Sequence, residues 1–175
     1  MSNNHAKIYV ITGPCAAGKT TISGMIASKM NNSAFIQGDY IYLMVVGGFV
    51  VPWEDDGTYI DLFWENILAI TENFIIRNIS VVLEYVIFPE QTKRIVDRFK
   101  EKNIPIKYTV LMADENTIRE RDSNRDVHER MGERAIILLN ELKEMNIEEK
   151  YILDTTNLSK DQVVNTIMTE NRFLL

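Results

Sequence analysis

Apolar residues along the chain follow two different spacings. Short runs rich in valine, isoleucine and tyrosine are typical of strands that are buried in a sheet. Longer stretches place apolar residues three or four positions apart, which is typical of helices with one buried face. On this pattern we predict strands at 7–12, 34–37, 80–85, 106–112 and 151–153, and helices at 21–30, 59–77, 89–102, 114–121, 130–145 and 159–172.

Strands and helices therefore alternate along the chain. Such alternation predicts an α/β fold, in which a five-stranded and mostly parallel sheet carries helices on both faces. The sequence contains no internal repeat, low-complexity stretch or Gly/Ser/Pro-rich linker, so we expect residues 1–175 to form a single domain. In folds of this kind ligands bind beyond the C-terminal ends of the strands, where candidate chemistry should therefore lie.

The loop between the first strand and the first helix carries two glycines, a lysine and a threonine at the spacing that surrounds a triphosphate. Gly13 and Gly18 allow backbone angles that turn successive N–H groups toward one anion at the N-terminus of a helix. Lys19 adds a positive charge near the β- and γ-phosphates, and the hydroxyl of Thr20 can bind Mg²⁺. The predicted nucleotide-binding residues of this loop are Gly13, Pro14, Cys15, Ala16, Ala17, Gly18, Lys19, Thr20 and Thr21.

The surroundings of this loop decide between a phosphate site and a glycine turn that merely joins a strand to a helix. A β-branched and aromatic run precedes the loop, as a buried strand requires. Four apolar residues between positions 22 and 30 share one helical face after it. Strand, loop and helix are all present, which favours the phosphate site.

Two carboxylates follow the second and third predicted strands, where both should face the phosphate loop. Asp39 comes shortly after residues 34–37, and Glu84 comes at the end of the third strand. Transfer of a phosphoryl group to an alcohol needs a carboxylate that orients the hydroxyl and accepts its proton, and commonly a second acid near Mg²⁺. We assign the first role to Asp39 and the second to Glu84. The alternatives are a turn or helix cap at Asp39 and a capping or ion-paired acid at Glu84.

Residues 119–134 hold five of the nine arginines of the chain and no lysine. A guanidinium group binds phosphate oxygens through paired hydrogen bonds and stays charged, which suits a lid that closes over a nucleotide. Arg121 and Arg125, on either side of a polar break, are the predicted phosphate contacts. The alternative is a solvated helix with Arg–Glu ion pairs, which we expect to account for Arg119 and Arg134.

The overall charge of −6, from 25 acidic and 19 basic side chains, disfavours a nucleic-acid or anionic-membrane surface. No stretch approaches the roughly 20 apolar residues of a membrane span, and the N-terminus lacks a basic region followed by a long apolar run. The only cysteine, Cys15, is expected to fill space in the phosphate loop, and His128 is expected to be an exposed lid residue. We therefore expect a cytoplasmic enzyme, a monomer or homodimer, without nucleic-acid or membrane partners.

The phosphate loop, Gly38, Asp39, Glu84 and the arginine-rich segment together resemble the small P-loop kinases. This superfamily includes gluconate kinases, shikimate kinases and chloramphenicol phosphotransferase. The resemblance covers nearly the whole chain, and the segments 119–134 and 151–159 are most similar to the chloramphenicol phosphotransferase group.

The resemblance implies a three-layer P-loop NTPase fold with a small arginine-rich lid at about residues 119–134. It implies ATP and Mg²⁺ as cofactors, with Asp39 as the carboxylate base. It also implies that Arg121 and Arg125 are lid arginines, and that the nucleotide base lies near the loop that contains Asn157.

The segment from Asp39 to Asn66, where this superfamily usually builds its acceptor pocket, contains no lysine or arginine. An acceptor that carries a carboxylate or phosphate would find few cations there, and burying an anion beside carboxylates is costly. We therefore predict a neutral or cationic hydroxyl acceptor with an apolar portion. The aromatic residues could instead belong to the core and the acids to the surface. The residues concerned are Tyr40, Tyr42, Met44, Val45, Val46, Phe49, Val50, Val51, Trp53, Tyr59, Phe63 and Trp64, with the acids Asp39, Glu54, Asp55, Asp56, Asp61 and Glu65.

The predicted function is an ATP-dependent small-molecule kinase that transfers the γ-phosphoryl group to an alcohol hydroxyl, in the manner of an antibiotic phosphotransferase. A sugar-acid kinase of the gluconate type or a nucleotide kinase is one alternative, and a noncatalytic nucleotide-binding regulator is another. A GTPase is disfavoured, because residues 157–161 do not match the Asn-Lys-x-Asp motif expected for base recognition.

Overall fold

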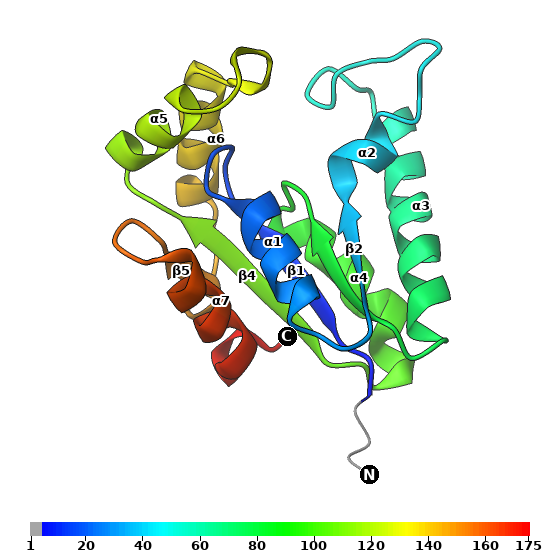
Figure 1. Ribbon diagram of the computed structural model, residues 1–175. Helices are drawn as coiled ribbons and strands as arrows, with labels where there is room; N and C mark the ends of the chain where they lie inside the picture. The colour runs from blue at the N-terminus through cyan, green and yellow to red at the C-terminus, as the bar shows by residue number, and fades with distance from the viewer. Residues whose placement is uncertain (1–4) are drawn as a thin grey trace.

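A five-stranded parallel sheet forms the centre of the protein (Figure 1). The computed structural model describes residues 5–175. The strands are β1 (Ile8–Thr12), β2 (Ser33–Gln37), β3 (Ser80–Glu84), β4 (Ile106–Met112) and β5 (Ile152–Asp154). They lie side by side in the order β2-β3-β1-β4-β5, and each neighbouring pair is parallel. The predicted α/β class is confirmed, with a sheet that is parallel throughout.

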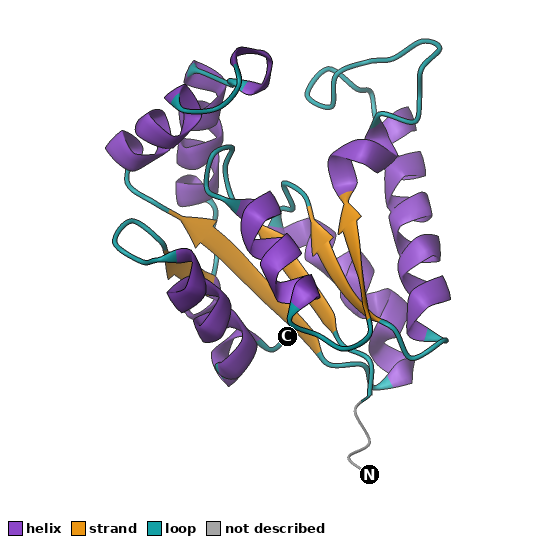
Figure 2. Ribbon diagram, in the orientation of Figure 1, coloured by secondary structure: helices purple, strands orange, loops and turns teal. Residues whose placement is uncertain are grey.

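Helices cover both faces of the sheet, which gives the predicted three layers (Figure 2). The alternation of side chains along β1 supplies both cores. Ile8 and Val10 join one hydrophobic cluster, and Tyr9 and Ile11 join the other. Within residues 5–175, no helix is both long and apolar enough to cross a membrane. The first cluster is covered by α3 (Thr58–Ile75) and α4 (Pro89–Phe99), and the second by α1 (Lys19–Ser28) and α7 (Lys160–Thr169).

The two helices of the predicted lid stand beyond the C-terminal end of β4 (Figure 1). They are α5 (Glu115–Ser123) and α6 (Glu133–Glu144), with a 3-10 turn at Val127–Glu129 between them. The helix α5 begins where the carboxylate of Asp114 accepts a hydrogen bond from the N–H of Thr117 at 2.7 Å. The predicted lid therefore consists of the end of α5, a loop and the start of α6.

A short helix that the sequence pattern does not predict, α2 (Gly38–Tyr42), follows β2 directly. Five residues are too few to display a helical period, so Gly38 and Asp39 suggest only a turn. Packing explains the helix, because Tyr42 is buried and the side chain of Tyr85 lies against the backbone of Gly38. A Cβ atom at Gly38 would lie 2.6–2.8 Å from atoms of the Tyr85 side chain, closer than real contacts allow.

Three predicted elements are shorter than or shifted from their predicted bounds, because a 3-10 turn occupies one end of each. The predicted helix 89–102 consists of α4 followed by such a turn at Lys100–Lys102. The last strand starts at Ile152, because Tyr151 closes another turn. The last helix ends at Thr169, and a turn at Asn171–Phe173 follows it.

A buried lysine on β4 explains where the last helix ends. The ammonium group of Lys107 donates hydrogen bonds of 2.8–2.9 Å to the carbonyl oxygens of Ile167, Met168 and Glu170. The last carbonyl groups of a helix have no partner within the helix, and a cation is favourable at that end. Lys107 therefore satisfies the end of α7 from inside the sheet.

Candidate functional site

The loop between β1 and α1 approaches β4 so closely that only glycine fits at its start. Gly13 has a φ of +144°, and a Cβ atom there would lie 2.3 Å from the carbonyl oxygen of Leu111. Ala16 and Gly18 also have positive φ, at 62° and 92°. These angles lead the backbone around the N-terminus of α1, which is the geometry of a phosphate-binding loop.

The N-terminus of α1 offers hydrogen-bond donors to an anion. Within the described chain, Gly18 occupies the N-cap position and no side chain caps the helix, so the first N–H groups keep their donor capacity. Lys19 is the first helical residue and is buried, and its ammonium group donates a hydrogen bond to the carbonyl oxygen of Pro14 at 3.0 Å. Thr20 and Thr21 are exposed in the same turn. The donors and the charge that phosphates require are therefore gathered in one turn.

Glu84 ends β3 between the ends of two other strands, where its register partners are Ile11 on β1 and Gln37 on β2. It is 4% exposed, and its carboxylate accepts a hydrogen bond from the hydroxyl of Thr20 at 3.2 Å. Burial raises the pKa of Glu84, and the positive charge of Lys19 acts in the opposite direction. The two predicted metal ligands are thus brought into contact.

The pair formed by Thr20 and Glu84 suits Mg²⁺. A hydroxyl and a carboxylate are hard oxygen ligands, and Mg²⁺ in nucleotide sites commonly uses one or two carboxylates together with water and phosphate oxygens. Among residues 5–175, no cluster of three or more histidine, cysteine, aspartate or glutamate side chains could hold a metal by itself. These side chains therefore fit a metal that binds together with phosphates.

Asp39 lies in the first turn of α2 and is exposed. Burial is the main reason why the pKa values of Glu84 and Tyr85 are raised, and the negative charge of Asp39 raises both further. The charge of Asp39 therefore acts on the carboxylate that contacts the phosphate loop. This position fits a base for an acceptor hydroxyl, and that role stays a prediction.

The sequence predicts that Cys15 fills space in the phosphate loop and that His128 is an exposed residue of the lid, and the surroundings of both residues fit these predictions. Burial raises the pKa of the Cys15 thiol, although the positive charges of Lys19 and Arg125 act against this rise. A thiol with a raised pKa is a poor nucleophile, so a space-filling role fits Cys15. His128 is exposed in the lid loop.

The two arginines predicted to contact phosphate face different parts of the site. The charge of Arg125 acts on the pKa of Glu84, against the effect of burial, so Arg125 lies within electrostatic reach of the phosphate loop. Arg121 instead donates hydrogen bonds to the hydroxyl and carbonyl oxygens of Thr155, at 3.1 and 3.0 Å. Thr155 belongs to the loop after β5 that also contains Asn157, near which the nucleotide base is expected. Phosphate contact stays a prediction for both arginines, of which Arg121 is already hydrogen-bonded to the loop after β5.

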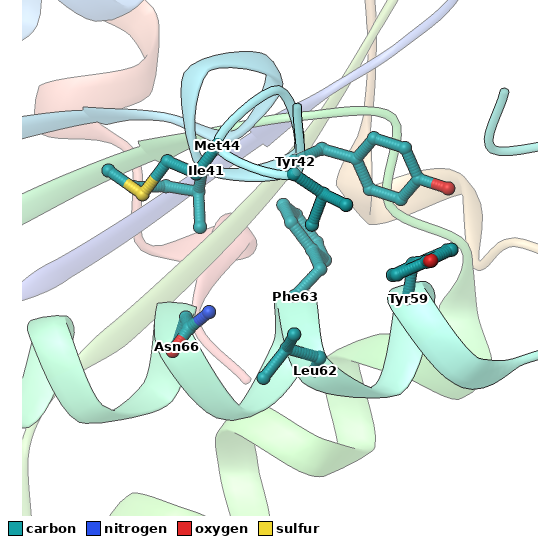
Figure 3. Close-up of a pocket in the computed structure, with 8 residues that line it drawn as sticks. Ile41, Tyr42, Met44, Tyr59, Leu62, Phe63 and Asn66 are labelled. Atoms are coloured by element: carbon teal, nitrogen blue, oxygen red, sulfur yellow. The ribbon is translucent and has the colours of Figure 1, made fainter. Parts of the chain in front are cut away.

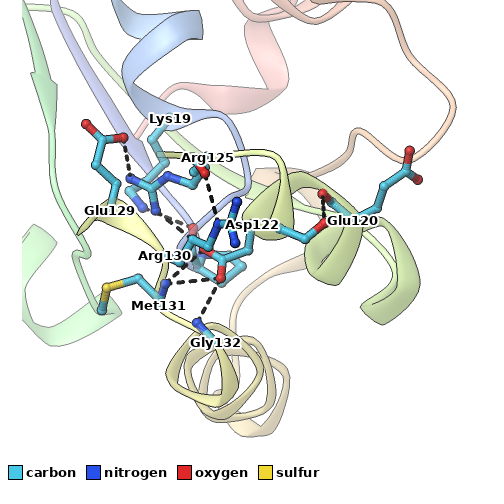
Figure 4. A network of polar contacts seen from close by, with 10 residues as sticks. Lys19, Glu120, Asp122, Arg125, Glu129, Arg130, Met131 and Gly132 are labelled. Atoms are coloured by element: carbon cyan, nitrogen blue, oxygen red, sulfur yellow. Dashed lines mark hydrogen bonds and ion pairs between the residues drawn. The ribbon is translucent and has the colours of Figure 1, made fainter. Parts of the chain in front are cut away.

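Asp122, which the sequence reasoning missed, is the centre of a polar network in the lid (Figure 4). It is 5% exposed, and its carboxylate accepts hydrogen bonds from the N–H groups of Met131 at 3.1 Å and Gly132 at 2.8 Å. It also lies 3.6 Å from the guanidinium group of Arg125. In the sequence Asp122 is one more acid in a mixed charge run, and only its burial distinguishes it.

Two other lid arginines form the ion pairs that the sequence predicts. Arg119 pairs with Glu115 at 2.8 Å and with Glu133 at 2.6 Å, and all three side chains are exposed. Arg134 pairs with Glu141 along α6 at 3.1 Å. The prediction that ion pairs account for Arg119 and Arg134 is confirmed.

The aromatic and aliphatic residues between Asp39 and Asn66 include a buried group and an exposed group. Tyr42, Phe63 and Trp64 are core residues, so the core alternative is right for them. The exposed group gathers on α2 and on the long segment that joins it to α3, and it can offer an apolar surface to a ligand. It consists of Tyr40, Leu43, Met44, Val46, Phe49 and Trp53.

Some acids of the same segment have structural partners. The carboxylate of Asp55 accepts hydrogen bonds from the N–H groups of Gly57, Tyr59 and Ile60 at 3.0–3.2 Å, and so caps α3. Asp61 pairs with an arginine of α4 at 2.8 Å. The surface alternative fits the exposed Asp61, and the half-buried Asp55 is a capping residue. Asp39 is the acid of this segment whose charge acts on Glu84.

An arginine of α6 contacts the segment from Asp39 to Asn66, where we predict that the acceptor binds. The guanidinium carbon of Arg134 lies 5.3 Å from the centre of the Trp53 ring, a cation–π distance. Trp53 is otherwise 57% exposed. A count of basic residues within 39–66 cannot reveal this contact, because Arg134 belongs to α6. The guanidinium group of Arg134 is also paired with the carboxylate of Glu141.

A pocket of about 200 Å³ lies between α2 and α3 (Figure 3). Its walls are mostly apolar, and the hydroxyl of Tyr59 and the amide of Asn66 are polar groups at its edges. Asp39, Lys19 and Glu84 are not among its lining residues. The pocket therefore adjoins the predicted acceptor segment without containing the predicted catalytic groups. Its lining consists of Ile41, Tyr42, Met44, Val45, Tyr59, Leu62, Phe63 and Asn66.

Comparisons with known proteins identify the fold. No protein-family model matches the chain, and no curated protein sequence does. A sugar kinase from Janibacter sp. HTCC2649 is similar in structure, with 15% identity, a TM-score of 0.69, and 94% of this chain and 93% of that one covered. The tunicamycin resistance protein of Deinococcus radiodurans is also similar, with 20% identity, a TM-score of 0.65, and coverage of 93% and 94%. A gluconokinase from Sinorhizobium meliloti 1021 is similar as well, with 17% identity, a TM-score of 0.62, and 91% of this chain and 87% of that one covered. The chain therefore shares the fold of these proteins, as its resemblance to the small P-loop kinases implies.

Proposed function

We propose that the protein is an ATP-dependent kinase that transfers the γ-phosphoryl group to a hydroxyl of a small molecule. One observation carries the proposal: the paired Thr20 and Glu84, with Lys19 and Arg125, adjoin the open N-terminus of α1. A triphosphate on that turn would meet backbone donors, an ammonium group and a guanidinium group, which are the parts that phosphoryl transfer uses. The fold shared with proteins named as kinases supports the same proposal.

In this proposal the side chains position the reactants and offset charge. Asp39 orients the acceptor hydroxyl and accepts its proton, while the acceptor oxygen bonds to the γ-phosphorus and the bond to ADP breaks. Lys19 and Arg125 offset the negative charge of the transferred group. Thr20 and Glu84 would hold Mg²⁺, and the metal would supply positive charge to the phosphate oxygens.

We also propose that the acceptor is neutral or cationic and has an apolar portion. Residues 39–66 carry no lysine or arginine, and the two arginines that reach this segment are each paired with a carboxylate, Arg94 with Asp61 and Arg134 with Glu141. The exposed aromatic and aliphatic side chains of the segment would contact the apolar portion. One structural neighbour is a tunicamycin resistance protein, which makes hydroxylated antibiotics a reasonable class to test.

The same physical arguments support a small-molecule partner in place of a macromolecule. A net charge of −6 disfavours nucleic acid and anionic membranes. A single cysteine within the phosphate loop suits a reducing compartment, so we propose a cytoplasmic location. We propose a monomer or homodimer, since the predicted site draws all of its groups from one chain.

An acceptor screen tests this function. ADP release would be measured with Mg·ATP and three panels: neutral hydroxyl compounds such as nucleosides and hydroxylated antibiotics, cationic amino sugars, and anions such as gluconate, shikimate and nucleoside monophosphates. We expect acceptor-dependent ADP release from the first two panels, and its loss in Lys19→Ala.

The outcomes separate the alternatives. Tight Mg·ATP binding without acceptor-dependent ADP release from any panel would favour a noncatalytic nucleotide-binding regulator. Efficient phosphorylation of gluconate or a nucleoside monophosphate would overturn the proposed acceptor class and leave the kinase standing. Unchanged nucleotide affinity in Lys19→Ala would mean that the loop is only a structural turn.

A further inference from the structure

We infer that Asp122 is a positioning residue that holds Arg125 at the phosphate loop before a nucleotide binds. The inference rests on the proposed nucleotide-binding function. Asp122 is buried beneath the lid loop, so it does not contact a ligand itself. Its effect on a nucleotide passes through Arg125, whose side chain is 35% exposed and therefore accessible.

The carboxylate of Asp122 closes the lid loop on itself. Asp122 lies in the last turn of α5, and the N–H groups of Met131 and Gly132, nine and ten residues later, both donate to it. Within this closed loop the N–H of Arg125 donates to the carbonyl oxygen of Asp122 at 3.1 Å. The guanidinium of Arg130 donates to the carbonyl oxygen of Arg125 at 2.9 Å. The backbone of Arg125 is therefore fixed from both sides (Figure 4).

The guanidinium group of Arg125 lies near two carboxylates, and its N–H donors stay free of hydrogen bonds within the described residues. Its guanidinium lies 3.6 Å from the carboxylate of Asp122 and 3.6 Å from that of Glu129, both beyond hydrogen-bond distance. A guanidinium has five N–H donors, and among the described residues none of those of Arg125 is used in a hydrogen bond within the protein. The donors are thus oriented and available for phosphate oxygens.

The two carboxylates beside Arg125 differ in their surroundings. The Asp122 side chain is 7% exposed, whereas the Glu129 side chain is 62% exposed. Water and salt screen an exposed pair far more than a buried one, so Asp122 contributes most of the electrostatic hold on Arg125. Glu129 is therefore a matched control, because it carries the same charge at the same distance.

The experiment is a double-mutant cycle read by nucleotide affinity. Calorimetry would measure the Kd of a nonhydrolysable ATP analogue with Mg²⁺ for the wild type, Asp122→Asn, Arg125→Ala, the double variant and Glu129→Gln. Removing one charge-assisted contact weakens binding about 10-fold or more, so we expect that loss in Asp122→Asn and in Arg125→Ala. Glu129→Gln should bind nearly as tightly as the wild type.

The double variant distinguishes positioning from mere stabilisation. If Asp122 acts through Arg125, Asp122→Asn should weaken binding no further once Arg125 is alanine. A full additional loss in the double variant, or no loss in Asp122→Asn alone, would overturn the inference. A wild type that does not bind the analogue at all would instead refute the proposed function.

Amide hydrogen exchange tests the closed loop without any variant or nucleotide. In the nucleotide-free wild type, the N–H groups of Met131 and Gly132 should exchange more slowly than the exposed N–H groups of the same loop. Exchange of both at the rate of an unstructured chain would overturn the inference, even if the Asp122→Asn protein failed to fold.

Discussion

Gly38→Ala should displace Asp39 while it leaves the phosphate loop intact. The added Cβ atom would lie 2.6 Å from Cδ2 of Tyr85 and 2.8 Å from its Cβ and Cγ atoms. Tyr85 has little room to withdraw, because it is 7% exposed and its ring centre lies 4.5 Å from that of Phe63. The start of α2 must therefore move away from β3, and Asp39, the next residue, moves with it.

The expected magnitudes follow from this overpacking. Forcing an extra carbon into a packed site costs roughly 1–3 kcal/mol. A chain of this length loses about 2–4 °C in Tm per kcal/mol, so Tm should fall by roughly 2–12 °C. A displacement of about 1 Å at a reacting group can slow transfer about 10²-fold. Nucleotide affinity should stay unchanged, because the atoms nearest the new carbon all belong to Tyr85 and not to the loop from Gly13 to Thr20.

Gly24→Ala is the matched control. Gly24 lies inside α1, and the nearest atom to an added Cβ would be Cε1 of Phe35 at 3.7 Å, an ordinary contact. Alanine should stabilise this helix by about 0.5–1 kcal/mol relative to glycine. Thermal unfolding by circular dichroism, calorimetry of nucleotide binding and acceptor-dependent ADP release would be compared for both variants. If Gly38→Ala matched Gly24→Ala in Tm and turnover, packing of Tyr85 on Gly38 would not set the position of Asp39.

Further predictions concern the lid and the buried acid. Arg125→Ala should lower turnover even more than nucleotide affinity, because in the proposed mechanism Arg125 offsets the charge of the transferred group. Steady-state kinetics that match the wild type would contradict this. Arg121→Ala should release the Thr155 loop and weaken nucleotide binding with less effect on saturated turnover; a loss confined to Tm would assign Arg121 to the fold alone. Burial raises the pKa of Glu84, so the folded state binds more protons than the unfolded state. The free energy of unfolding therefore falls as the pH rises above the ordinary pKa of a glutamate, about 4.3. Glu84→Gln should therefore raise Tm near neutral pH and abolish Mg²⁺-dependent nucleotide affinity, and a Tm below the wild type at neutral pH would refute the burial argument.

The parts of the fold and site that depend on local patterns could be predicted from the sequence. The five strands are short apolar runs, and the long helices have apolar residues three or four positions apart. Around Gly13 and Gly18 a strand, a glycine loop and a helix follow one another in the chain. Glu84 could be placed beside this loop, because parallel strands end at the same edge of a sheet. Its contact with Thr20 follows from that topology.

The parts that depend on packing between distant segments could not be predicted. The helix α2 begins where the side chain of Tyr85, more than forty residues later, lies against Gly38. The contact between Trp53 and Arg134 joins two elements that share no pattern. Asp122 differs from its acidic neighbours because the N–H groups of Met131 and Gly132 donate hydrogen bonds to it. These contacts depend on the fold of the lid loop and cannot be predicted from the residue type.

The most direct test of the proposed kinase mechanism is the amount of phosphorylated acceptor that Asp39→Asn forms with saturating Mg·ATP, measured as the mass gain of the best acceptor from the screen. A general base contributes roughly 10²–10⁴ in rate, so transfer should fall by that factor while the affinity for an ATP analogue stays at the wild-type value. Wild-type transfer by Asp39→Asn would contradict the proposed mechanism, because it would remove Asp39 from it and make Glu84 the next candidate for the base.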